Sequence, residues 1–232
     1  MPQGPEEEFT SEMHFTDEIV CELVQVCASD LMVVNAARVS FNRESEELGD
    51  KEKGLINFLM KNHHGTPFEH NMFTFRVEAP LFVQREQMRH RIGHSYNEWS
   101  GRYAKMDPKF YVPSYVRTQV GGPYDFEEVN GDAANVFRIH LEKTYRALYM
   151  EYERALRQDV AKEQARYFLP VSTYTKYFWT CNARSLMHFV GLRNHPNAMF
   201  EIAQVAKSAE NSLIDHMPET ASRYVEHGRI AP

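Results

Sequence analysis

The segment that most constrains the fold is NMFTFRVEA, residues 71–79, in which every second residue from Phe73 onward is apolar. A period of two is typical of a β-strand, and no other stretch of the chain shows it as clearly. The residues His64-Gly65-Thr66-Pro67 precede the strand and break any helix before it. Pro80 follows it and suits the first turn of a new helix.

Most of the remaining chain carries apolar residues at helical spacing. The predicted helices cover residues 31–41, 54–64, 81–91, 132–156, 161–169, 183–193 and 197–216. The longest, 132–156, has an apolar stripe made of Phe137, Leu141, Tyr145, Leu148 and Tyr152. Residues 42–54 are charged and read as a loop, and residues 109–114 look extended. The pattern predicts an α+β fold: a helix-rich mixed α/β domain with a small antiparallel-type central sheet.

The 232 residues are 43% hydrophobic, which suits a single catalytic domain over 1–232. Residues 1–16 are acidic and are expected to form a flexible lead-in without the apolar core of a signal peptide. No apolar run is long enough to span a membrane. The three cysteines are odd in number and form no CxxC pair, so reduced thiols in a cytoplasmic protein are expected.

The net charge of −6 disfavours loose binding to nucleic acid or to an anionic membrane. Against this background, residues 89–103, RHRIGHSYNEWSGRY, hold three arginines and only one acid, Glu98. Three further arginines lie in otherwise apolar helical sequence: Arg166, Arg184 and Arg193. A surface salt-bridge network is one interpretation, but the nearby acids are too few to pair the whole set. The favoured interpretation is a site for a phosphate-bearing ligand.

Two other kinds of chemistry compete with that interpretation. His90, His94 and Glu98 would share one face of a continuous helix and could hold the metal of a metal-dependent hydrolase, although Gly93 is poor helix interior. We expect no metal. Cys181 has no adjacent base and is expected to be a small buried residue rather than a nucleophile. A non-catalytic nucleotide sensor with the same arginine pocket is the second alternative.

The sequence resembles the flavin-dependent thymidylate synthases. Their signature is RHR, a short spacer, and then Ser, Asn, Ser and Arg at fixed intervals, which Arg89-His90-Arg91, Ser95, Asn97, Ser100 and Arg102 supply. Further segments that look like the family are AARVSF at 36–41, TPFEH at 66–70, FTFRVEAP at 73–80, FYVPS at 110–114, ARYFLP at 165–170 and FWTCNARSLMHF at 178–189. One departure is the spacer, which has three residues, Ile92, Gly93 and His94, where two are usual. The extra residue must bulge out, and no role is assigned to Gly93 or His94.

The resemblance implies a methyltransferase of nucleotide biosynthesis, a flavoprotein that reductively methylates dUMP to dTMP. The carbon would come from 5,10-methylenetetrahydrofolate and the hydride from FAD that NADPH has reduced, without a cysteine nucleophile. The resemblance also implies a homotetramer whose active sites combine residues of several chains.

Site residues are carried over by position. Arg193 would be the catalytic residue, stabilising negative charge at N3 of the uracil. The dUMP contacts would be Glu86, Gln87, Arg89, Ser100, Gly101, Arg102, Arg166 and Arg193. The FAD contacts would be Ser40, Thr66, Arg89, His90, Arg91, Glu98, Asn182, Arg184 and His188. Glu86 stands where some members have glutamine, and its carboxylate could bind a sugar hydroxyl but would repel phosphate.

Overall fold

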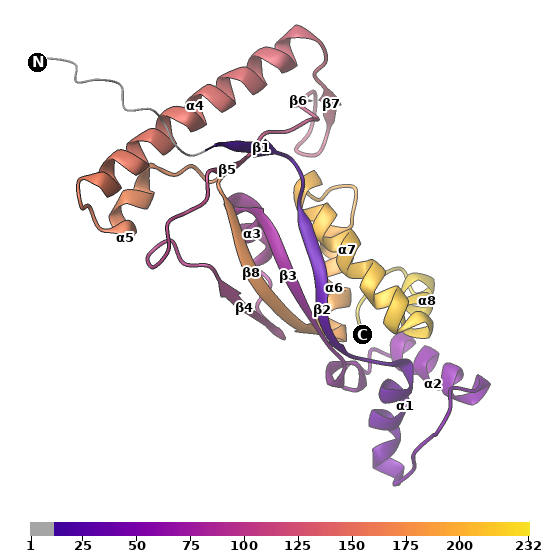
Figure 1. The fold of residues 1–232 in the computed structure, drawn as a ribbon. Helices are drawn as coiled ribbons and strands as arrows, with labels where there is room; N and C mark the ends of the chain where they lie inside the picture. The colour runs from indigo at the N-terminus through magenta and orange to yellow at the C-terminus, as the bar shows by residue number, and fades with distance from the viewer. Residues whose placement is uncertain (1–11) are drawn as a thin grey trace, which may run out of the picture. The chain divides into compact units, whose positions relative to one another are not determined.

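The computed structural model describes residues 12–232, which form two compact units (Figure 1). The smaller unit contains residues 12–18, Ala79–Phe82 and Trp99–Thr175. The larger contains Ile19–Glu78, Val83–Glu98 and Lys176–Pro232. A single catalytic domain over the whole chain stays a prediction.

The larger unit is built on a four-stranded sheet with the strand order β2-β3-β8-β4. Its strands are β2 (Val20–Cys27), β3 (Met72–Pro80), β8 (Tyr174–Asn182) and β4 (His94–Glu98). β2 pairs antiparallel with β3, and β4 pairs antiparallel with β8, so the predicted small antiparallel sheet is confirmed. β3 is the strand that the alternation predicts, and its apolar residues from Phe73 to Ala79 are fully buried.

Helices surround this sheet. They are α1 (Asp30–Arg38), η1 (Val39–Phe41), α2 (Asp50–Lys61), η2 (Thr66–His70), α3 (Leu81–Gln87), α6 (Ala183–Arg193), α7 (Phe200–His216) and α8 (Pro218–Glu226). The indole of Trp179 on β8 stacks on Phe75 of β3 at 4.8 Å and meets the ring of Phe189 edge-on at 4.9 Å. Phe189 belongs to α6, so this aromatic cluster fixes α6 against the sheet. In Figure 1, α7 runs beside β2.

The segment after α3 differs from its prediction. The expected helix 81–91 ends at Gln87, and residues 94–98 form a strand, β4, in which His94 lies opposite Cys181. The metal interpretation assumed a continuous helix over residues 90–98 and is wrong in that respect, because His94 and Glu98 stand at the two ends of a strand, where four residues span roughly 13 Å. Within residues 12–232 there is no group of three or more His, Cys, Asp or Glu side chains that could hold a metal ion.

Two of the three spacer residues, Ile92 and Gly93, form the turn that precedes β4. Ile92 is 90% exposed, and Gly93 has a φ of +71°, a left-handed conformation that favours glycine. A Cβ atom at position 93 would stand 2.1 Å from the Ser185 hydroxyl oxygen. Glycine is therefore required in this turn for space as well as for conformation.

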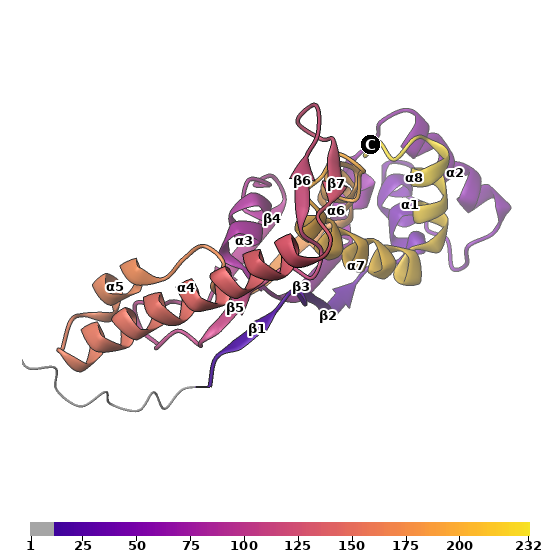
Figure 2. The ribbon, with the colours of Figure 1, turned by 90° about the horizontal axis from the view of Figure 1, so that it is seen from above.

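The smaller unit is built around one long helix, α4 (Asp132–Arg157), as predicted. Its other elements are α5 (Lys162–Ala165), η3 (Arg166–Phe168), β1 (His14–Thr16), β5 (Lys109–Tyr111), β6 (Arg117–Gln119) and β7 (Phe126–Glu128), the last two forming the hairpin seen in Figure 2. Tyr145, Tyr149 and Tyr152 of α4 pack with Phe110 in its core. Phe137, which was expected on the buried apolar stripe, is 46% exposed. Tyr149, which was not part of the predicted stripe, is fully buried.

Residues 14–16 of the predicted flexible lead-in are part of the fold. Residues 14–16 form β1, which pairs in parallel with β5, because Phe15 packs against the core at Phe110. The first eleven residues of the predicted lead-in lie outside the described part. Among the helices of residues 12–232, none is both long enough and apolar enough to cross a membrane.

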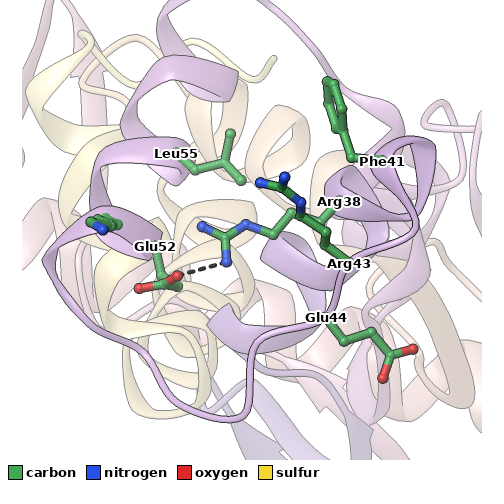
Figure 3. Close-up of a pocket in the computed structure, with 7 residues that line it drawn as sticks. Arg38, Phe41, Arg43, Glu44, Glu52 and Leu55 are labelled. Carbon is green, nitrogen blue, oxygen red and sulfur yellow. Dashed lines mark ion pairs between the residues drawn. The ribbon is translucent and has the colours of Figure 1, made fainter.

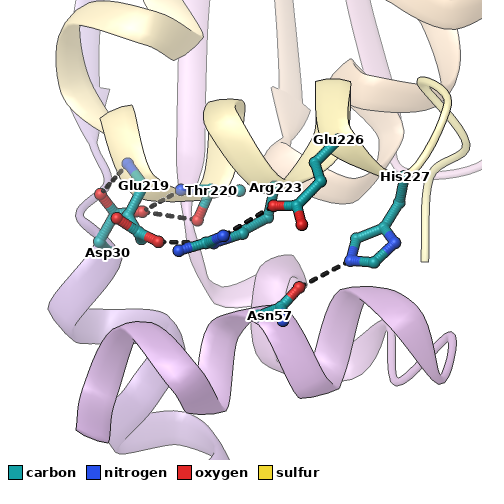
Figure 4. Close-up of polar contacts among 7 residues, drawn as sticks. All are labelled: Asp30, Asn57, Glu219, Thr220, Arg223, Glu226 and His227. Atoms are coloured by element: carbon teal, nitrogen blue, oxygen red, sulfur yellow. Dashed lines mark hydrogen bonds and ion pairs between the residues drawn. The ribbon is translucent and has the colours of Figure 1, made fainter. Parts of the chain in front are cut away.

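A buried carboxylate joins the start of α1 to the start of α8 (Figure 4). Asp30 is 4% exposed and accepts hydrogen bonds from the backbone N–H groups of Glu219 at 2.9 Å and Thr220 at 2.8 Å. The Thr220 hydroxyl donates a third bond to it at 2.6 Å. These contacts satisfy first-turn donors of α8 that no carbonyl of the helix can reach. Asp30 thus holds the C-terminal helix to α1.

We predict that Asp30→Ala lowers the free energy of unfolding by about 2–3 kcal/mol, because it leaves buried donors without an acceptor. Asp30→Asn should lose less, since its carboxamide oxygen still accepts. Urea denaturation measures both, with Asp215→Ala, an exposed acid at the end of α7, as the control. Equal stability of Asp30→Ala and the control would contradict the assignment.

Candidate functional site

A cavity of about 610 Å³ in the larger unit is lined by Arg85, Glu86, Arg89 and Arg193. Arg85 and Glu86 lie on α3, and the backbone continues as helical turns beyond the end of this helix. Arg89, four residues after Arg85, therefore lies on the same side as Arg85. Arg193 is the last residue of α6. The side chains of Arg85 and Arg89 make no ion pair within the described range 12–232, so three guanidinium groups face one carboxylate. Such a cavity attracts an anion.

Arg193 is held by two side chains. Its Nη1 forms an ion pair with the Glu86 carboxylate, and its Nε donates to His90 Nε2 at 2.9 Å. His90 is 8% exposed, and burial, followed by the charge of Arg193, lowers its pKa to about 4. The imidazole is therefore neutral near pH 7, which leaves the lone pair on Nε2 free to accept from Arg193.

A second cavity, of about 450 Å³, lies in the same unit. Its lining includes Gly93, Asn182, Ser185 and His188. Asn182 ends β8 and caps α6, since its side-chain oxygen accepts from the Ser185 N–H at 2.8 Å. The carboxamide N–H₂ of Asn182 makes no hydrogen bond to any described residue. It remains able to donate to a carbonyl of a bound ring.

Arg184 lies at the rim of this second cavity, four residues before His188 and so on the same face of α6. Its guanidinium already has partners: Nη1 binds Glu69 at 2.6 Å, and Nε donates to the Pro232 carbonyl at 2.5 Å. A ligand at this rim would have to use the remaining N–H groups of Nη1 and Nη2, or displace one of these two partners.

His90 connects the linings of the two cavities. It bonds to Arg193 of the first, and its ring lies 6.1 Å from the ring of His188 of the second, between centroids. The ring of His94 is 5.9 Å from it and accepts, through Nδ1, a bond from Trp179 Nε1 at 2.9 Å. Burial, followed by the charge of His188, lowers the pKa of His94 to about 4. The three imidazoles thus form one cluster, defined here as His90, His94 and His188.

The predicted nucleotide contacts fall in both units. Glu86, Arg89 and Arg193 line the first cavity together. Gln87 is fully buried beneath it; its Oε1 accepts from the Tyr177 hydroxyl at 2.5 Å, and its Nε2 has no partner among the residues described.

The other four predicted nucleotide contacts belong to the smaller unit: Ser100, Gly101, Arg102 and Arg166. Arg102 pairs there with Glu163 at 3.2 Å, and Arg166 Nε donates to the Glu163 carbonyl at 3.3 Å. Gly101 is buried against Met106, whose sulfur would stand 3.0 Å from an added Cβ. Both arginines are exposed and close to one acid, which leaves part of their donor capacity to solvent or a ligand.

Three predicted flavin contacts, Asn182, Arg184 and His188, line the second cavity. The others are placed around the larger unit: Ser40 is exposed on η1, Thr66 opens η2, Arg89 lines the first cavity, His90 joins the histidine cluster, Arg91 is exposed, and Glu98 on β4 accepts from Gln84 Nε2 at 2.8 Å. The second cavity is the place in the larger unit where predicted flavin contacts gather.

The expectation that the arginines lack acid partners is wrong for three of them. Arg102, Arg184 and Arg193 pair with Glu163, Glu69 and Glu86. These acids lie 61 to 115 positions away along the chain, where a count of local acids does not reach them. Sequence reasoning also missed Arg85, although its spacing of four from Arg89 on a predicted helix was a usable signal.

Cys181 agrees with its prediction as a small core residue. It is fully buried on β8, and burial raises the pKa of its thiol well above the ordinary value. A thiol in that state is not a nucleophile.

Comparisons with known proteins show the family of this chain. Residues 22–219 match the family model described as thymidylate synthase complementing protein. The chain belongs to this family. Its relatives include the flavin-dependent thymidylate synthases of Streptomyces coelicolor, 43% identical over 93% of this chain and 94% of that protein, and of Streptomyces avermitilis, 44% identical over 94% and 95%. The resemblance seen in the sequence is confirmed.

Solved structures of PolB, a UMP/dUMP methylase from Streptomyces cacaoi, have the same fold as this chain. The complex with 5-Br UMP superposes with a TM-score of 0.87 and the complex with 5-Br dUMP with 0.88. Both are 39% identical and cover 95% of this chain and 100% of the PolB chain.

The lowered pKa values of His90 and His94 predict an acid-sensitive fold. The unfolded chain takes up these protons near pH 6.5, but the folded chain only near pH 4. The free energy of unfolding should therefore have its full value above about pH 6.5. It should fall as the pH drops from about 6.5 to about 4. Urea denaturation across this window measures the slope.

A variant isolates the contribution of one imidazole. His90→Gln keeps an acceptor for Arg193 but cannot take up a proton, so its stability should fall less steeply over the same window. Identical slopes for the variant and the unaltered protein would show that His90 does not titrate as assigned.

Proposed function

We propose that this protein reductively methylates dUMP to dTMP, taking the carbon from 5,10-methylenetetrahydrofolate and the hydride from FAD that NADPH reduces. The relatives named flavin-dependent thymidylate synthase and the nucleotide-bound PolB structures support this activity. The observation that carries the proposal is the arginine-lined cavity, whose Arg193 is linked through the neutral His90 to the cavity that holds the predicted flavin contacts.

The phosphate of dUMP requires charge-assisted donors. Arg89 is exposed, lines the first cavity and makes no ion pair within the described residues, so its guanidinium is available for this task. Arg85 extends the same positive surface. Arg102, Arg166 and the backbone around Ser100 and Gly101 are the further phosphate contacts of the proposal.

Carbon 5 of the uracil becomes nucleophilic when negative charge develops at N3 and its neighbouring carbonyl. Arg193 is the proposed group that stabilises this charge. Its Nε is held by His90, so the guanidinium is oriented before the nucleotide arrives. Preorganised charge of this kind needs no rearrangement as the reaction proceeds and is commonly the largest catalytic contribution.

Glu86 competes with the nucleotide for Arg193, because its carboxylate occupies Nη1. Binding of a ring that develops negative charge would have to replace or share this contact. The carboxylate would then be free to accept a hydrogen bond from a sugar hydroxyl.

The second cavity suits a flavin ring system, which supplies the hydride chemistry when bound. Asn182 offers a free carboxamide donor, and His188 offers a ring nitrogen at the same cavity. Gly93 lines it without a side chain, where a Cβ would also approach Asn182 Nδ2 at 2.8 Å. His90 and Arg91 would orient the ring toward the pyrimidine.

A homotetramer with shared active sites is part of the proposal. The exposed apolar residues Val136, Phe137 and Ile139 on α4, which are 46–62% exposed, support an interface between subunits there. Light scattering of the purified protein measures the assembly.

The activity predicts a yellow protein that NADPH bleaches. With methylenetetrahydrofolate and NADPH present, tritium should be released from carbon 5 of labelled dUMP, and release should depend on FAD and resist chelators. UMP run in parallel tests whether this chain shares the two substrates in PolB's description. Binding of dUMP without tritium release from the FAD-loaded protein would favour a nucleotide sensor instead.

Arg193→Ala should lower the rate of methylation about a hundredfold or more while the flavin spectrum is kept, because the variant loses the N3 donor and no predicted flavin contact. Arg76→Ala, which removes an exposed arginine paired with Glu22, is the matched control. Turnover of Arg193→Ala at the rate of the control would remove Arg193 from the mechanism.

A further inference from the structure

A third cavity, of about 700 Å³, lies between the end of α1 and the start of α2 (Figure 3). Its cationic lining residues are Arg38, Arg43 and Lys51, which come from α1, the following loop and the first turn of α2. None of its lining residues belongs to the predicted nucleotide or flavin contacts, although Ser40 stands on η1 beside Arg38.

Arg38 is the partnered cation of the cavity. It forms an ion pair with Glu52 at 2.7 Å and also contacts the Ser45 hydroxyl. Glu52 is fully committed, because it further accepts from the Gly49 N–H and the Ser45 hydroxyl, both at 3.2 Å. Backbone hydrogen bonding, followed by these contacts with Arg38 and Ser45, lowers the pKa of Glu52. This carboxylate is therefore charged and already occupied.

The other two cations are not neutralised. Neither the Arg43 nor the Lys51 side chain has an ion pair or hydrogen bond to any residue from 12 to 232. The Arg38 and Arg43 side chains line the same cavity, and in Figure 3 the Glu44 carboxylate points away from their guanidinium groups. Like charges gathered in this way repel, and an anion that bridges them removes the repulsion.

The loop that carries Arg43 is held in place. Ser45 makes two backbone hydrogen bonds to the Asn35 side chain of α1, at 2.8 and 3.0 Å. Asn42 turns the chain with a φ of +50°. The guanidinium is thus presented by an anchored turn, so less conformational entropy is lost when a ligand binds.

The cavity also has an apolar side. Phe41 is 75% exposed, and Leu55 completes the lining from α2. An exposed aromatic ring next to guanidinium groups offers a stacking surface for a nucleobase. We propose that this cavity is a separate binding site for a phosphorylated nucleotide, with the phosphates on Arg43 and Lys51 and the base against Phe41. The site does not depend on the proposed methylation.

Isothermal titration with inorganic pyrophosphate and with ADP tests the site. Both probes should bind saturably to the purified protein, and equally well after FAD and dUMP have been added in saturating amounts. The double variant Arg43→Ala/Lys51→Ala should weaken both probes at least about tenfold. Phe41→Ala should weaken ADP about fivefold or more and leave pyrophosphate unchanged.

Lys61→Ala is the control, because it removes one positive charge from the other end of α2, outside the cavity. It should bind both probes as the unaltered protein does. Absence of saturable binding, or equal affinity in the double variant and the control, would overturn the site. Loss of pyrophosphate binding on addition of FAD or dUMP would assign the cavity to those ligands. Unchanged ADP affinity in Phe41→Ala would show that the nucleobase does not stack on Phe41.

Discussion

The antiparallel pairing of β4 with β8 is the constraint on which the candidate site depends. β8 ends at Asn182, which caps α6, and α6 carries Arg184, His188 and Arg193. β4 begins at His94, opposite Cys181, and thereby fixes the turn that precedes it. A slip of one residue would turn each β4 side chain to the opposite face of the sheet. The pairing register therefore decides which imidazoles meet α6.

Burial gives this arrangement its chemical character. The aromatic cluster around Trp179 excludes water from His90 and His94, and desolvation favours their neutral forms. A neutral His90 can accept from Arg193, whereas a protonated one would repel it. Orientation of the guanidinium thus follows from the core packing behind the cavity as much as from the cavity itself.

Local patterns identified some of the elements but missed β2, β8 and α8, and they did not reveal contacts between distant segments. The period of two in 71–79 and the helical spacing in 132–156 and 183–193 identified β3, α4 and α6, since these signals are repeated over many residues. β4 was missed because HSYNE has no apolar alternation and is only five residues long. The acid partners of Arg184 and Arg193 could not be found from a local charge count, because tertiary folding brings Glu69 and Glu86 to them.

The first and third cavities differ in how their charge is balanced, and the difference bears on ligand exchange. At Arg193 the Glu86 carboxylate already stands where an anion would bind. A ligand must displace it, so the binding free energy gained at Arg193 is only the difference between the contact with the ligand and the contact with Glu86. Such a site favours a ligand that also satisfies the free Arg85 and Arg89, since those contacts displace no acid of the chain. Near α1 the Glu52 carboxylate is already committed to Arg38, Ser45 and the Gly49 N–H, and the Arg43 side chain has no ion pair with any residue from 12 to 232 that an incoming anion would have to displace. Specificity at the first cavity therefore rests on the number of guanidinium groups that one ligand can reach at once, which a monophosphate joined to an acidic ring satisfies better than either part alone.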